Sequence, residues 1–124
     1  MTPIQHKFHH ALILLYATII AALSLLPAEE AINLDIWDKA QHFAAYAVFM
    51  LLALPIGNTH KARLKYALGI IGFSVFIELA QQFSPGRDTS AEDTIANSLG
   101  VMSGYLIGWL VLKFFQGRGD QAAI

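Results

Sequence analysis

The chain has 124 residues, of which 56% are hydrophobic and only 14% are charged. A soluble domain usually carries about 45–50% apolar and about 25% charged residues, so this composition excludes an ordinary soluble domain. The sequence contains no cysteine, which also excludes disulfide and thiolate chemistry. The apolar residues are gathered in blocks, and the chain is therefore expected to lie in a membrane.

Four apolar blocks are long enough to cross a membrane once their polar ends are counted. A span needs about 20 residues, because the hydrocarbon core is ~30 Å thick and a helix rises about 1.5 Å per residue. The loops between the blocks are short, so we expect a single all-α domain covering residues 1–124. It is expected to be an integral membrane bundle of four transmembrane helices, at about 8–26, 38–56, 65–83 and 94–115.

The basic residues predict that both termini are cytoplasmic. Six of the eight Lys and Arg residues lie on the side of the spans that holds the termini, and two lie on the other side. Lys and Arg favour the cytoplasmic side of a membrane. The first span could be mistaken for a signal peptide, but residues 25–27, Leu-Leu-Pro, form a poor cleavage site. We therefore expect this span to be retained.

Three pairs of polar residues with i and i+4 spacing lie at the ends of three expected spans. All three ends face the extracytoplasmic side. On a helix this spacing stacks two side chains on one face, one turn apart. Ionisable groups in or beside a span are costly, so they are candidates for a functional site. The pairs are Asp38 with His42, Glu78 with Gln82, and Asp93 with Asn97.

Three of these side chains are candidates for acid or base catalysis. Asp38 and His42, one turn apart, form an arrangement suited to proton transfer, and Tyr46 continues their face. Glu78 is expected ~18 Å into its span, where a carboxylate needs a partner, a proton or a wet cavity. The alternative is a structural role, with His42 at the interface and Glu78 in a helix-orienting hydrogen bond. A single outer histidine does not favour zinc, so no metal or other cofactor is expected.

Arg87 is the candidate for binding an anionic group. It follows a Pro85–Gly86 turn and precedes the start of a helix, and guanidinium and backbone N–H groups bind phosphate or carboxylate well. The alternative is an internal ion pair from Arg87 to one of the nearby carboxylates, which are Glu78, Asp88 and Asp93.

A ladder of small residues follows Asn97 along the last span. Gly100, Gly104 and Gly108 are spaced by four residues. Such ladders let two membrane helices approach closely. We expect plain bundle packing on this face, which would turn Asn97 toward the interior.

Several motifs resemble those of the VanZ-like proteins. The run DKAQHFAAY at 38–46 is similar to the DKxxHFxxY signature of that family. So are ELAQQF at 78–83 with PGR at 85–87, and Asp93 with Asn97 and Gly100. The resemblance covers about residues 20–105.

The resemblance implies a small multi-pass protein of the bacterial cytoplasmic membrane. Namesake members are associated with low-level resistance to teicoplanin, a glycopeptide antibiotic with a lipid tail. The resemblance carries over no catalytic role. It implies a shared site whose purpose is open, at Asp38, His42, Glu78, Gln82, Arg87, Asp93 and Asn97.

Three functions remain open. The first is binding of an envelope lipid or lipidated glycopeptide-type ligand at the outer leaflet, through the shared site and Tyr46. The second is a membrane enzyme acting on a lipid-linked phosphate or glycan, with His42, Asp38 and Glu78 as candidates. The third is a small multidrug-type transporter, which is least favoured because the first span carries no carboxylate. No nucleic acid partner is expected, and the sequence identifies no protein partner.

Overall fold

The computed structural model describes residues 2–26, 35–57, 59–84 and 91–122, and these ranges are almost entirely helical and contain no strand. Four of the helices are long and apolar enough to cross a membrane. The expected all-α class with four transmembrane helices is therefore confirmed. In chain order the elements are α1 (Pro3–Ser24), α2 (Asp35–Ala53), the 3-10 helix η1 (Leu54–Ile56), α3 (His60–Ala80), the 3-10 helix η2 (Gln81–Phe83) and α4 (Ala91–Ala122).

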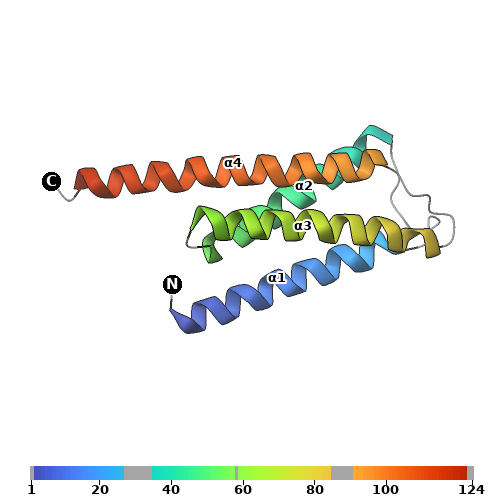
Figure 1. Ribbon diagram of the computed structural model, residues 1–124, viewed down its shortest axis with the longest axis horizontal. Coiled ribbons are helices and arrows are strands. Elements are labelled where there is room, and N and C mark those ends of the chain that lie inside the picture. The colour runs from blue at the N-terminus through green and yellow to red at the C-terminus, as the bar shows by residue number, and fades with distance from the viewer. Residues whose placement is uncertain (1, 27–34, 58, 85–90, 123–124) are drawn as a thin grey trace.

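Consecutive helices run in opposite directions, so the two termini lie at the same end of the bundle (Figure 1). The start of α2, the end of α3 and the start of α4 lie at the opposite end. This arrangement places the three polar pairs of the sequence at one end, as the alternation of the spans requires.

Two helices begin earlier than the apolar residues alone indicate, because polar caps extend them. The Thr2 side chain accepts a hydrogen bond from the Gln5 backbone at 3.2 Å, and the Gln5 side chain accepts one from the Thr2 backbone at 2.8 Å. This capping box starts α1 at Pro3. Thr59 caps α3 in a similar way, accepting from the Ala62 backbone at 3.1 Å, so α3 starts at His60.

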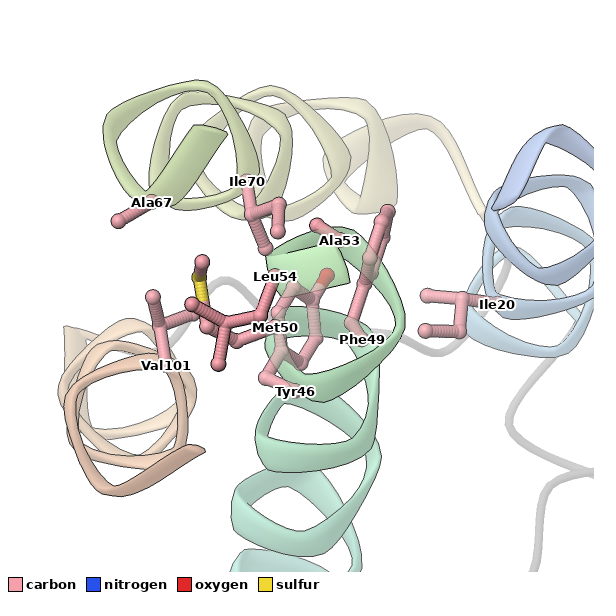
Figure 2. Packing of buried hydrophobic residues seen from close by; sticks show 9 residues of the cluster. All are labelled: Ile20, Tyr46, Phe49, Met50, Ala53, Leu54, Ala67, Ile70 and Val101. Carbon is pink, nitrogen blue, oxygen red and sulfur yellow. The ribbon is translucent and has the colours of Figure 1, made fainter. Parts of the chain in front are cut away.

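Helix α2 occupies the centre of the packing. Figure 2 shows Met50 and Phe49 of α2 surrounded by side chains from the other three helices. Met50 is fully buried, and the buried residues around it include Val101 from α4 and Ile70 from α3. On the remaining side, Ile20 of α1 points toward Phe49. The core is therefore built around α2 rather than around a central axis shared by four equal helices.

The closest helix pair is α2 with α4, and glycines make it possible. A Cβ added to Gly100 would overlap the carbonyl oxygen of Phe43, and one added to Gly104 would overlap the carbonyl oxygen of Ala47. Such close approach of backbones is what small residues permit in membrane helices. The expected packing on the glycine face is confirmed, and it turns Asn97 inward, with 3% of its surface exposed.

Helix α1 is attached more loosely than the others. Only 6% of its most apolar 18-residue stretch is buried, against 28–33% for the other three helices. Its contact with α2 includes a hydrogen bond from the Tyr16 hydroxyl to the Ala45 carbonyl oxygen at 2.5 Å. Large apolar side chains are exposed on all four helices, as expected of surfaces that face hydrocarbon; examples are Leu14, Leu51, Phe76 and Leu110.

Candidate functional site

Buried polar side chains gather in the half of the bundle away from the termini. In the described ranges they are Ser74, Glu78 and Gln81 on α3 and η2, and Asp93 and Asn97 on α4. None of their buried nitrogen or oxygen atoms lacks a hydrogen-bond partner. The site is therefore an ordered polar cluster inside membrane-spanning helices.

A chain of hydrogen bonds joins α2, α4 and α3. The Asn97 amide Nδ2 donates to Ser74 Oγ at 2.7 Å, which leaves the amide oxygen Oδ1 facing His42. His42 Nδ1 lies 3.0 Å from this oxygen. Because an amide oxygen can only accept, Nδ1 is the donor and carries a proton. Asn97 thus connects the two neighbouring helices through one side chain.

The polar chain continues from Ser74 toward Glu78. Ser74 shares a hydrogen bond with the Tyr46 side chain, and Tyr46 also interacts electrostatically with Glu78. Tyr46 and Glu78 are both buried, with 3% and 7% of their surfaces exposed. The cluster therefore runs from the half-buried His42, through Asn97 and Ser74, to an acidic side chain inside the bundle.

An ion pair lies one turn beyond this chain, nearer the end of the bundle. The Lys39 ammonium of α2 bonds to the Asp93 carboxylate of α4. The Asp93 side chain is only 12% exposed, whereas that of Lys39 is 36% exposed. The sequence offered Asp93 as a possible partner of Arg87, and that pairing stays a prediction because Arg87 lies outside the described residues. Lys39 was not among the predicted site residues.

The end of α3 is tied to the end of α1 by Gln81 and Ser84. Gln81 Nε2 donates to the Ser24 carbonyl oxygen at 2.9 Å, and Ser84 Oγ donates to that of Leu25 at 2.9 Å. Gln82, which the sequence paired with Glu78, is exposed. The α-helix ends at Ala80, and the following 3-10 helix turns farther per residue, so Gln81 rather than Gln82 faces the bundle.

Two predicted site residues cannot be placed against this cluster. Asp38 belongs to α2, one turn before His42, but its side chain lies outside the described part of the chain. Arg87 lies outside the described residues altogether. The expected Asp38–His42 pair and the expected anion site at Arg87 therefore stay predictions.

The cluster is suited to holding and moving protons. With its proton on Nδ1, a neutral His42 ring presents Nε2 as the basic nitrogen. Among the described residues, no three His, Asp or Glu side chains are grouped so that they could hold a metal ion. The chemistry that these side chains offer is hydrogen bonding and acid–base exchange.

The comparison with known families matches the greater part of the chain. The model of the family described as VanZ/LLP1 matches residues 4–113. This range includes His42, Glu78 and Asn97, and it begins in α1 and ends in α4. No curated protein and no solved structure matches the chain. The chain is thus a multi-pass membrane protein that belongs to the VanZ/LLP1 family.

Proposed function

We propose that the polar end of the bundle recognises the headgroup of an envelope lipid, or of a lipidated glycopeptide-type ligand, at the outer leaflet of the bacterial cytoplasmic membrane. The observation that carries the proposal is the hydrogen-bonded chain from the half-buried His42 to the buried Asn97 and Ser74, within helices that cross a membrane. Under this proposal the protein binds its ligand with the headgroup at this cluster and the lipid tail along the apolar helices.

Helix docking alone is a poor reason for this cluster. Polar groups inside a span are costly, and each needs a hydrogen-bond partner. Helices α2 and α4 are already held together by backbone contact at Gly104 and by apolar packing of Met50 with Val101. The hydrogen bonds through Asn97 come in addition to these contacts, and bringing their polar groups into the span carries a desolvation cost. A ligand that forms hydrogen bonds with these groups would explain why they lie in the span despite that cost.

The charges of the chain favour the outer leaflet. The end with the termini carries six basic residues against two at the polar end, which places the polar end outside under the positive-inside rule. At that position the site meets lipids and lipidated antibiotics that reach the membrane from outside. Binding such an antibiotic would keep it from its target, and this is how the protein would contribute to resistance.

Native mass spectrometry of the protein in mild detergent tests the proposal. The variants are His42→Ala and Arg87→Ala, with Ser98→Ala as the control. Ser98 lies next to Asn97, but its hydroxyl donates to the Thr94 carbonyl oxygen of its own helix at 2.8 Å. We expect a bound lipid mass in the wild type and in Ser98→Ala that is lost in the other two. Equal retention of every bound lipid mass in all four proteins would refute the proposal.

A cellular measurement addresses the resistance role. Expression of the wild type in a teicoplanin-sensitive bacterium is expected to raise the concentration of teicoplanin that stops growth. Expression of His42→Ala at the same level is expected to leave that concentration as it is in cells without the protein. If both proteins protect equally, the polar cluster does not carry the resistance.

A membrane enzyme acting on a lipid-linked phosphate or glycan is the second candidate. The hydrogen bond to Asn97 orients the His42 ring, with Nε2 as a general base, and Glu78 supplies a buried carboxyl group. The test is release of phosphate from undecaprenyl pyrophosphate in detergent. An enzyme would lose turnover in His42→Ala while still binding the lipid. No release of phosphate by the wild type would contradict an enzyme that acts on this lipid-linked phosphate.

A further inference from the structure

An apolar groove of about 530 Å³ lies between α1 and α3 and extends from Ala62, near the end that holds the termini, to Ala17 and Phe73 past the middle of these helices. Helix α1 and α3 form its walls, with Ala17 on one side and Gly69 and Phe73 on the other, and Phe49 of α2 forms its floor. Figure 1 shows α1 leading away from α3 toward the N-terminus. None of the residues that line the groove belongs to the polar cluster, which lies nearer the other end of the bundle.

The groove needs an apolar occupant in the membrane. It opens between helices that cross the hydrocarbon core, and nearly all of its lining is apolar. An empty groove would lose the dispersion contacts of its walls, and water finds few hydrogen-bond partners there. Its volume is within the range of about 300–1,000 Å³ that is typical of ligand sites. The hydrocarbon chain of a lipid meets these requirements.

Two lysines mark where the headgroup of this lipid would lie. Lys65 lines the groove, and Lys61 is one turn before it on the same face of α3. Both side chains are exposed, and no carboxylate of the described residues forms an ion pair with either. Like charges at i and i+4 repel each other, and an anion between them would remove this repulsion. The mouth of the groove is therefore suited to a phosphate.

We propose that the groove binds an anionic phospholipid, with one acyl chain between α1 and α3 and the phosphate at Lys61 and Lys65. The apolar part holds the acyl chain but does not distinguish one phospholipid headgroup from another. The selection comes from the lysines, each worth about a five-fold preference for an anionic headgroup. This lipid is distinct from the ligand proposed for the polar end.

The acyl-chain part is tested by filling the groove. A side chain at Gly69 meets no atom within 4 Å of its Cβ, and the same holds for Gly72, which does not line the groove. Gly69→Leu therefore adds bulk to the groove with no clash at its Cβ, and Gly72→Leu is the matched control. Phosphatidylglycerol is added to the detergent-solubilised proteins and counted by native mass spectrometry. We expect at least ten-fold weaker binding in Gly69→Leu and wild-type binding in Gly72→Leu. Equal binding by both variants would overturn the proposal.

The headgroup part is tested by comparing phosphatidylglycerol with phosphatidylcholine. The double variant Lys61→Gln with Lys65→Gln is expected to lose its preference for phosphatidylglycerol by about twenty-five-fold. Lys113→Gln on α4 is the control, since that ammonium lies over the Trp109 ring and away from the groove. An unchanged preference in the double variant would overturn the assignment of the headgroup.

His42→Ala separates this site from the one at the polar end. We expect this variant to bind phosphatidylglycerol as the wild type does, whether or not it loses another ligand. If His42→Ala releases phosphatidylglycerol and Gly69→Leu retains it, the lipid lies at the polar end and the groove site is wrong.

Discussion

Replacing Gly104 by alanine tests whether backbone contact holds α2 and α4 together. The added Cβ would overlap the Ala47 carbonyl oxygen and lie 3.1 Å from the Ala47 carbonyl carbon and Cα. All three atoms belong to the backbone of α2, so no side-chain rotation can make room. The two helices must separate, and the neighbouring contact of Gly100 with Phe43 is stretched at the same time.

The size of the effect follows from two opposing terms. Overpacking of a tight interface costs about 1–3 kcal/mol. Alanine is favoured over glycine inside a helix by up to about 1 kcal/mol, which offsets part of that cost. The matched control is Gly72→Ala, whose Cβ meets nothing within 4 Å, so only the favourable term applies. We therefore expect Gly104→Ala to be about 1–3 kcal/mol less stable than Gly72→Ala.

Unfolding in mixed micelles with an increasing share of sodium dodecyl sulfate gives both free energies. The two tryptophans of the chain, Trp37 and Trp109, belong to α2 and α4, so their fluorescence reports on the helix pair under test. If Gly104→Ala proves as stable as Gly72→Ala, close backbone contact is not what holds these helices together. A larger substitution, Gly104→Val, is expected to lower the stability further.

The same unfolding measurement checks three further predictions. Lys39→Gln should lower the free energy of unfolding by about 1 kcal/mol, because the mostly buried Asp93 carboxylate loses its bond to this ammonium. Adding Asp93→Asn to this variant should restore most of the loss, and additive effects of the two substitutions would contradict the pairing. Asn97→Leu should cost about 1–3 kcal/mol because two hydrogen bonds between helices are lost; stability equal to wild type would show that the network contributes nothing. Gln81→Leu should lower the free energy of unfolding by about 1 kcal/mol and Gln82→Leu by less than about 0.5 kcal/mol, since of these two only Gln81 bonds to α1. A larger loss in Gln82→Leu than in Gln81→Leu would contradict the assigned side-chain directions.

Features that depend on spacing along one helix could be predicted from the sequence. The length of the apolar blocks predicts four membrane helices, which the structure confirms. The four-residue spacing of Gly100 and Gly104 predicts close packing with a neighbouring helix, and the same face carries Asn97 inward. Both are consequences of helix geometry and composition, and neither requires knowledge of which helix is the neighbour.

Features that depend on how two helices face each other could not be predicted in this way. The i+4 rule pairs His42 with Asp38 on its own helix, and this pair stays a prediction. The rule could not indicate the partner that the structure shows 55 residues away, Asn97. The rotation of one helix against another is not encoded in the spacing of either. The buried Gln81 was missed for a local reason, because a 3-10 helix replaces the last turn of α3. Lys39 entered the sequence argument as a charge to be counted and as part of the DKxxHFxxY motif, but not as a site residue.

The order in which the chain is made gives the pairing of α2 with α4 a further consequence. At a synthesis rate of about 5–20 residues per second, His42 precedes Asn97 by roughly three to eleven seconds. During this interval α2 is in the membrane without the helix that covers its small-residue face and completes its polar contacts. Insertion factors and quality-control proteases therefore meet an incomplete bundle at this stage. A chain that stops before α4 is expected to be degraded rather than to accumulate.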